Sequence, residues 1–218
     1  GDNARAIWTR VQQESEGAQH LASFITRLAD GSTLDHLSVN CGAALARWQG
    51  FVRIDGSNAH AGFYGATMLA GSEHGDTALT VKHTAPHSTS AELFKNVVDD
   101  RATGAFQGMI AVEQQAQKTD ATMMTRSLLL SDEGQFASKP ELEIFADDVR
   151  CGHGATAGNI DPNQLFYLMA RGLPRPEAER LLIEAFLDEA IDAAGDETLA
   201  EALKPIVSAW LARRGAAG

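Results

Sequence analysis

The chain has 218 residues, 44% of them hydrophobic and 22% charged, so it is long enough to bury a core and has the composition of a globular protein. Its net charge of -11, from 29 acidic and 18 basic residues, argues against nucleic acid as a partner, because phosphate binding needs clustered lysine and arginine. No apolar run approaches the roughly 20 residues of a membrane span, and residues 1–13 lack the pattern of a secretory signal. We therefore expect a cytoplasmic protein with no membrane partner.

Short strands separated by turns are predicted from Leu21 to about His153. The clearest strand is 77–83, where strict alternation puts Leu79 and Val81 on one face with His83. Weaker strand patterns cover 37–41, 51–54, 67–70, 108–112, 127–130 and 142–146. The spacing between these runs is compatible with a sandwich, a barrel or a solenoid of stacked coils, and periodicity alone does not choose among them.

Helices are predicted in the last quarter of the chain. The first begins at Asp161, a capping residue, followed by Pro162, which suits the first helical turn, and it ends at Gly172. A second helix with one apolar face follows Pro174 and ends near Gly195. The sequence therefore predicts a β-rich body followed by an α-helical tail.

A third helical stretch carries apolar residues over 199–211, and Pro205 within it is expected to break or kink the helix. The composition changes abruptly after Gly158. We place the domain boundary there, with a β-rich domain in 1–158 and a helical region in 159–218.

Two histidines, His83 and His87, lie four residues apart and would align on a helix. Pro86 and the preceding strand pattern disfavour a helix here, so the pair is expected to straddle a strand end and a turn. A structural or surface role is favoured. Metal binding or catalysis is the alternative, for which a third ligand at a sensible spacing is missing.

A thiol and an imidazole two residues apart stand out at Cys151 and His153, beside Gly152 and Gly154. On one strand both side chains would point the same way, and together they could hold iron or a nascent cluster. The alternatives are a buried structural thiol with a hydrogen-bonded histidine, or a catalytic Cys–His pair without the usual surrounding signature. The other cysteine, Cys41, has no role assigned from sequence and is too distant for a disulfide framework to be predicted.

The common catalytic fingerprints are absent from the sequence, which has no Walker A loop, dinucleotide-binding glycine motif, nucleophile elbow or zinc-protease motif. Two acidic doublets, Asp99-Asp100 and Asp147-Asp148, could serve as acid and base of a hydrolase. Such doublets are more often turn residues.

From Thr84 onward, a series of motifs occurs in a characteristic order. They include Glu92-Leu93-Phe94-Lys95-Asn96-Val97, Asp99-Asp100-Arg101-Ala102, Ala116-Gln117-Lys118-Thr119-Asp120-Ala121, Lys139-Pro140-Glu141-Leu142-Glu143-Ile144 and Asp147-Asp148-Val149-Arg150-Cys151-Gly152-His153-Gly154. Together they resemble the SufB and SufD family, which belongs to the SUF system for iron-sulfur cluster assembly. The chain is most similar to the C-terminal part of SufD members, because Gly154 follows the motif histidine where SufB-like sequences usually carry glutamate.

The resemblance implies a right-handed parallel β-helix, a solenoid, in 1–158, followed by a small C-terminal α-helical region in 159–218. It also implies a scaffold subunit without enzymatic activity of its own. Family members act with SufB and with SufC, the ATPase of the system. The β-helix would pair with SufB, and the helical region would dock SufC, with Phe166, Leu182 and Phe186 as expected contacts.

The same resemblance implies that His153, accompanied by the thiol of Cys151, serves cluster assembly at the junction with SufB. No cofactor is expected to be stably bound; iron or an iron-sulfur cluster would be held transiently and shared with SufB. For the isolated chain, a homodimer through the β-helix is an open alternative, and the sequence does not decide its oligomeric state. Residues 1–20 are too few for the long N-terminal region of SufD proteins, so the chain is either a fragment or a short homologue.

Two rival functions stay open at this point. The first is a β-helix carbohydrate-active hydrolase or lyase that uses Asp99, Asp100, His83 or His87. The second is a purely structural pairing module in which His153 only packs.

Overall fold

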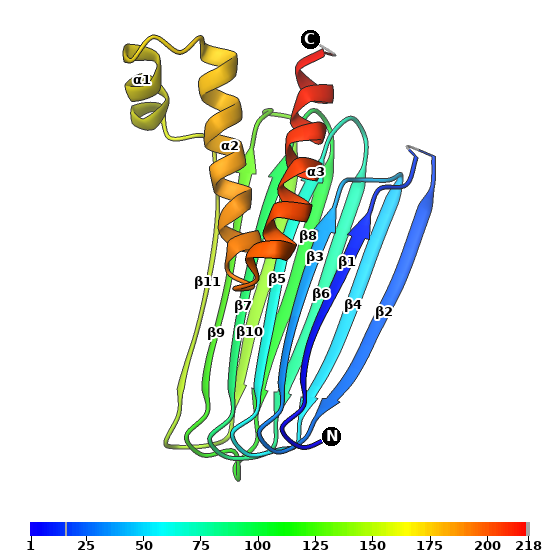
Figure 1. Ribbon diagram of the computed structural model, residues 1–218, viewed down its shortest axis with the longest axis vertical. Coiled ribbons are helices and arrows are strands. Elements are labelled where there is room, and N and C mark those ends of the chain that lie inside the picture. Colours follow the sequence, from blue (N-terminus) through cyan, green and yellow to red (C-terminus); the bar gives the residue numbers. More distant parts are fainter. Residues whose placement is uncertain (16, 217–218) are drawn as a thin grey trace.

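The computed structural model describes residues 1–15 and 17–216, and within them eleven strands form two parallel sheets (Figure 1). Odd-numbered strands form a six-stranded sheet in the order β1-β3-β5-β7-β9-β11, and even-numbered strands form a five-stranded sheet in the order β10-β8-β6-β4-β2. The strands are β1 (Arg5–Gln12), β2 (Gln19–Leu28), β3 (Thr33–Asn40), β4 (Leu45–Ile54), β5 (His60–Leu69), β6 (His74–His83), β7 (Thr89–Val98), β8 (Thr103–Val112), β9 (Asp120–Leu129), β10 (Gln135–Ile144) and β11 (Arg150–Gly158). Because consecutive strands alternate between the sheets, the chain is a β-solenoid, which confirms the predicted β-helix and excludes the sandwich and barrel alternatives.

The interior between the two sheets follows from the alternation within each strand. In β6, Leu79, Val81 and His83 are buried while the residues between them are only half-buried, as predicted. Large apolar side chains fill the space, including Trp48, Phe63, Phe94, Phe106 and Ile110. Side chains from the opposite sheet pack onto the strand backbone: a Cβ added to Gly108 would lie 2.3 Å from Sδ of Met123, so a larger residue there would displace that side chain.

The turns between coils stack on one another. Gly31, Asn58, His87 and Lys118 all have positive φ, between 57° and 63°, and occupy equivalent turns of successive coils. Backbone hydrogen bonds link these turns along the solenoid; His87, for example, donates its N–H to the carbonyl of Gln117 at 2.9 Å. The same left-handed turn conformation therefore recurs at these four positions, one in each successive coil.

Three helices follow the solenoid: α1 (Pro162–Ala170), α2 (Arg175–Asp192) and α3 (Glu197–Ala216). Asp161 caps α1 by accepting the N–H of Asn163 at 2.8 Å, and the first two helices are followed by Gly172 and Gly195 with positive φ. These starts and stops confirm the sequence prediction. None of the helices described is both long and apolar enough to cross a membrane.

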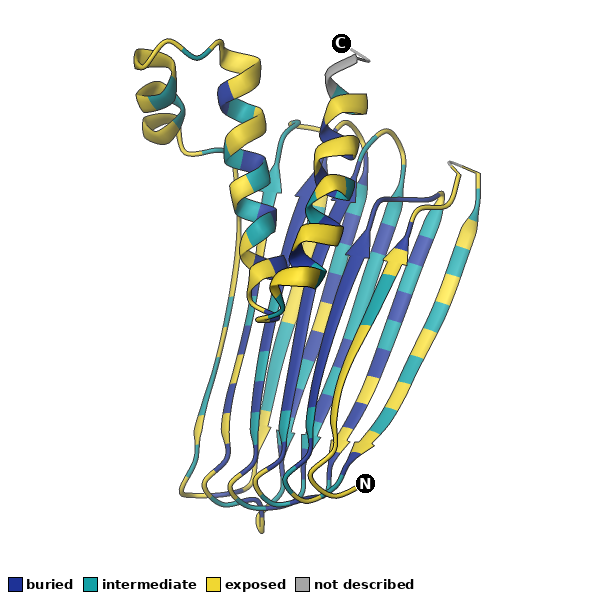
Figure 2. Ribbon diagram, viewed as in Figure 1, coloured by how far each residue is buried: buried dark blue, intermediate teal, exposed yellow. Residues whose placement is uncertain are grey.

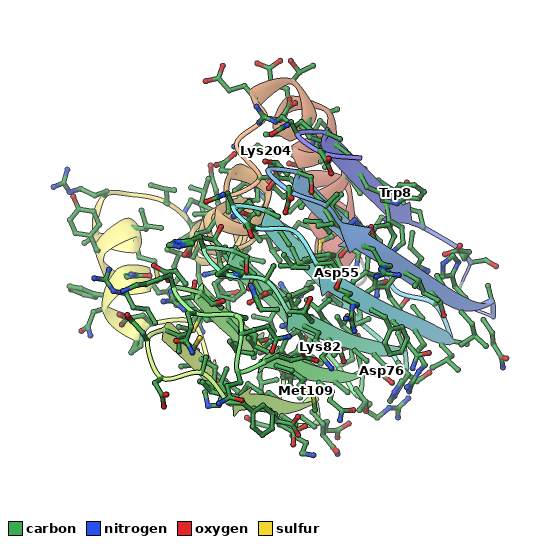
Figure 3. The ribbon with its side chains drawn as sticks, turned by 90° about the horizontal axis from the view of Figure 1, so that it is seen from below. Trp8, Asp55, Asp76, Lys82, Met109 and Lys204 are labelled. Atoms are coloured by element: carbon green, nitrogen blue, oxygen red, sulfur yellow. The ribbon has the colours of Figure 1, made fainter. Side chains whose placement is uncertain are left out.

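Helices α2 and α3 cover the outer face of the six-stranded sheet (Figures 1 and 2). A second apolar core lies between them and the sheet; it contains Leu37, Val39, Tyr64, Met68, Ile183, Leu187, Val207 and Trp210. Seen along the strands, Lys204 of α3 lies on one side of the molecule and Met109 of the five-stranded sheet on the opposite side (Figure 3). The predicted domain boundary between residues 158 and 159 stays a prediction, because strands and helices share this second core.

Pro205 was predicted to break or kink the helix. The break is wrong, because α3 is one continuous helix with Pro205 inside it, and the kink stays a prediction. Proline removes the hydrogen bond to the carbonyl four residues earlier, which belongs to Glu201. Both Pro205 and Glu201 are exposed, so water can satisfy that carbonyl. On the opposite side of the helix, buried Leu203 and Val207 hold it against the sheet.

Candidate functional site

One end of the solenoid is formed by the edge strands of both sheets, β10 and β11. Within the described residues, β11 pairs only with β9, and β10 only with β8. Arg150 donates its N–H to the carbonyl of Thr119 at 2.9 Å. Since hydrogen-bonding direction alternates along a parallel strand, the N–H groups of Cys151, His153 and Ala155 point away from β9, toward the open edge. This edge can accept another strand.

The two sequence-predicted site residues, Cys151 and His153, lie on β11 and face the solenoid interior. Cys151 is in register with Ala121 and His153 with Met123, and both partners are buried in the interior core. Cys151 is half-buried against that core, and His153 is exposed at the rim. The prediction that both side chains point the same way is confirmed.

The thiol of Cys151 is protonated at rest. Burial raises its pKa, and the nearby carboxylate of Asp120 raises it further. A thiol must lose its proton to bind a metal, so metal binding here would release a proton. Among the described residues, no group of three or more His, Cys, Asp or Glu side chains is placed to hold a metal ion. A metal at Cys151 and His153 would therefore need further ligands from outside this chain.

A buried polar cluster lies in the solenoid interior, where His83 meets Ser88 and Ser90 near the start of β7. Nδ1 of His83 lies 2.8 Å from Oγ of Ser88, and Ser88 in turn donates to the carbonyl of Ala85. Nδ1 must therefore be the protonated nitrogen, and Nε2, 3.1 Å from Oγ of Ser90, accepts from that hydroxyl. Burial lowers the pKa of His83 to about 4, so the ring is neutral.

The two histidines considered from sequence do not converge. His83 is fully buried, whereas His87 is exposed in the turn with a φ of 57°. They straddle a strand end and a turn, as expected, and the metal alternative has no geometric support in this arrangement.

The site also contains one residue that sequence reasoning missed, Glu92 on β7. Its side chain is on the same strand face as Ser90 and Phe94 and is only 3% exposed. Neither carboxyl oxygen has a hydrogen-bond partner in the described part of the chain. Burial raises the pKa of Glu92 to about 8, so the carboxyl is mostly protonated at neutral pH. No local signal in the sequence marks it, because the inward position of Glu92 follows only from the strand register.

This carboxyl makes stability depend on pH. Its pKa is near 4.5 when unperturbed and about 8 in the fold, so its contribution is complete below about 4.5 and is lost as the pH rises through 8. We expect the free energy of unfolding to fall between about pH 4.5 and 8, and Glu92→Gln to remove most of that decline. Urea unfolding of both proteins at a series of pH values measures it. Parallel pH profiles for the two proteins would show that Glu92 does not titrate in the fold.

The acidic doublets are turn residues that do not come together. Asp99 forms an ion pair with Arg214 of α3, and Asp100, with a φ of 50°, accepts the N–H of Gly71 at 2.8 Å. Asp148 forms an ion pair with Lys118. The first doublet follows β7 and the second precedes β11, at opposite ends of the coils, so no acid–base pair is assembled from them.

The three predicted partner contacts on the helices have different surroundings. Phe166 of α1 is 73% exposed, and no residue of that helix is buried. Leu182 is half-buried on α2. Phe186 is also half-buried, and Nζ of Lys95 lies over its ring, 4.5 Å from the centroid. Only Phe166 therefore presents a free apolar surface; the docking role of all three stays a prediction.

Lys95 lies on the outer face of β7 beneath α2. Its side chain is 1% exposed and forms an ion pair with Glu189, whose side chain is 51% exposed. Arg126 of β9 is 3.9 Å from the same carboxylate. Glu189 thus ties α2 to two neighbouring strands of the six-stranded sheet.

Cys41, which was left without a role, is buried beside α3. Burial raises the pKa of its thiol to about 11, so it is protonated at physiological pH. It lines an open cavity together with Trp210, Arg213 and Glu73. These surroundings indicate that the thiol of Cys41 has a structural role, packing between the solenoid and α3.

Comparison with known proteins gives consistent matches over most of the chain. The family model described as "SUF system FeS cluster assembly, SufBD core domain" matches residues 1–186. An iron-sulfur cluster assembly SufBD family protein of Synechocystis is 36% identical over 210 residues, which is 95% of this chain and 46% of that protein. The iron-sulfur cluster assembly protein SufD of Escherichia coli is 34% identical over 197 residues, covering 90% of this chain and 47% of that protein.

A SufBD family protein of Mycobacterium tuberculosis is 30% identical over 194 residues, covering 85% of this chain and 48% of the relative. The chain spans about half the length of the curated relatives it matches. The matched region contains the whole solenoid, with Cys151 and His153, and continues into α2.

Proposed function

The chain belongs to the SufBD core family of the SUF system for iron-sulfur cluster assembly, and from that premise we propose that it is a SufD-like scaffold subunit of the assembly complex. It pairs with SufB through the β10 and β11 end of the solenoid and docks the SufC ATPase through its C-terminal helices. It has no enzymatic activity of its own, works in the cytoplasm and holds no cofactor permanently. Iron or a nascent cluster is its transient cargo, shared with SufB.

The observation that supports this proposal best is the position of His153 and Cys151 on β11, an edge strand whose outer side meets no other strand within the described residues. The imidazole is exposed at the rim, and the thiol stands beside it on the same face. An imidazole and a thiol suit iron, but two ligands are too few for a closed site. A partner strand that continues the sheet would bring further ligands to the same edge.

The direct test of the scaffold role is co-purification of the chain with SufB and SufC. Retention of both partners supports the proposal, and purification of the chain without either contradicts it. Activity of the isolated chain on a panel of polysaccharides and esters would instead favour the β-helix hydrolase or lyase.

The helical docking surface is centred on α1 in this proposal. Its exposed apolar residues are Phe166, Tyr167 and Met169, and α1 projects from the body beside α2 (Figures 1 and 2). Exposed aromatic side chains on a helix are typical anchors of protein–protein interfaces. SufC is the occupant that family membership suggests.

Replacing Phe166 with Glu should weaken SufC binding by roughly tenfold or more, because a central aromatic anchor contributes about 2 kcal/mol. Thermal stability should be unchanged, since no core residue contacts are lost. Isothermal titration with purified SufC measures the affinity, and Ile25→Glu on β2, where Ile25 is 77% exposed and outside the helices, is a matched control. Equal affinities for wild type and Phe166→Glu would remove α1 from the docking surface.

A further inference from the structure

A carboxyl group is buried behind the candidate site, two strands in from its open edge. Glu92, Met123 and His153 are in register on β7, β9 and β11 and face the interior. Since neighbouring strands are about 4.8 Å apart, the carboxyl lies roughly 10 Å from the imidazole along this row.

Within the described residues, no charged group is paired with this acid. Phe63 and Met123 flank it in the row, and both are apolar. Ser90, the nearest inward polar neighbour along β7, is hydrogen-bonded to His83, and its hydroxyl lowers the pKa of Glu92 by less than burial raises it. Buried polar groups without partners are rare and costly, and they occur at functional sites more often than elsewhere.

Among the described residues, no cation lies beside Glu92 on the interior face either; Arg10 is on β1, three strands away. His83 on β6 and His36, two strands away on β3, both have pKa values lowered to about 4 by burial and are neutral. Tyr64 on β5 and Lys95 on β7 face the outer side of the sheet, and Lys95 is paired with Glu189. The remaining titratable groups that face the acid are Cys151 and His153 themselves, with Asp120 at the start of β9 beside the thiol.

We propose that Glu92 is the buried counter-charge for a divalent metal ion held at Cys151 and His153. This inference rests on the proposed function and adds to it the charge state of the cargo, such as ferrous iron. On binding, Cys151 loses its proton and becomes a thiolate, and Glu92 loses its proton and becomes a carboxylate. Both protons pass to solvent, no group is oxidised or reduced, and the two negative charges balance the 2+ ion. A charge-neutral arrangement is the one that a low-dielectric interior favours.

Glu92 is a positioning residue in this account, since it stabilises the ion through space and not as a ligand. An opposite charge roughly 10 Å away across the protein interior changes affinity by about tenfold. Removing it should therefore weaken metal binding without abolishing it. Removing Cys151 or His153 should have a larger effect.

The test uses Co²⁺ as a probe, titrated anaerobically into the chain in complex with SufB and SufC at pH 7.5. Thiolate-to-cobalt absorption reports the ion, and calorimetry in two buffers reports the protons released. Glu92→Gln should bind Co²⁺ about tenfold more weakly and release fewer protons per ion than wild type. Glu92→Met, which places no unpaired polar group in the core, should behave the same way, so a folding defect in one variant does not decide the outcome.

Glu113→Gln is the matched control, because Glu113 is a surface acid paired with Lys82 on the five-stranded sheet, and it should leave both values unchanged. If both Glu92 variants match wild type in affinity and proton release while Cys151→Ala lowers affinity, the counter-charge role is wrong and the site itself stands. If neither Cys151→Ala nor His153→Ala alters cobalt binding, the proposed site fails and the inference fails with it.

Discussion

Replacing Ala155 with proline should abolish co-purification with SufB while leaving the solenoid folded. Ala155 is exposed on β11, and its N–H points to the open edge. Proline has no N–H to donate, and it is tolerated in an edge strand where that N–H would face solvent. Strand addition depends on main-chain hydrogen bonds along the whole edge, so loss of one donor together with the bulk of the ring should weaken pairing by at least about tenfold.

Ala155→Val is the matched control, since valine keeps the N–H and favours strands. A pull-down with tagged SufB, together with a thermal unfolding curve for each variant, separates pairing from folding. If Ala155→Pro is recovered with SufB in the wild-type amount, the β11 edge is not the pairing surface.

Glu189→Ala should destabilise the protein by about 3 kcal/mol, whereas Lys95→Met should be nearly neutral. The asymmetry arises because Lys95 is 1% exposed and Glu189 is 51% exposed. Removing the glutamate leaves an ammonium group buried with only the ring of Phe186 above it. Removing the lysine leaves a carboxylate that water can solvate, and methionine fills the space that the lysine chain occupied.

Urea unfolding of the two single variants and of the double variant measures this effect. The double variant should recover most of the stability lost in Glu189→Ala, because no unpaired charge is then buried. Equal losses in the two single variants would show that the ion pair is solvated and does not hold α2 on the sheet.

The parts of the fold that depend on local chemistry could be predicted from sequence. Asp161 and Gly172 marked the ends of α1 because capping and left-handed turns require particular residues. The strand at 77–83 was predicted because its alternation is strict. The stacking of coils was not predictable from periodicity, since strands of a sandwich, a barrel and a solenoid share one pattern; the ordered family motifs supplied that part.

The candidate site was only partly predictable for a related reason. The spacing of Cys151 and His153 placed them on one strand face, but their position at an open edge depends on the register of eleven strands. Glu92 was missed because nothing local distinguishes an inward acid from an outward one. Phe186 was expected on a docking surface, yet it is covered in part by Lys95, a contact between residues far apart in the chain.

The most direct measurement is cluster formation on the complex with SufB and SufC when His153 is replaced by alanine. Iron and sulfide are supplied anaerobically, and the visible absorption of the assembled cluster is followed over time. The account predicts that His153→Ala forms the complex in normal yield but assembles cluster at least about tenfold more slowly than wild type, as expected when a metal-ligating group is lost. Wild-type rates and yields of cluster in that variant would contradict it and leave the histidine as a packing residue.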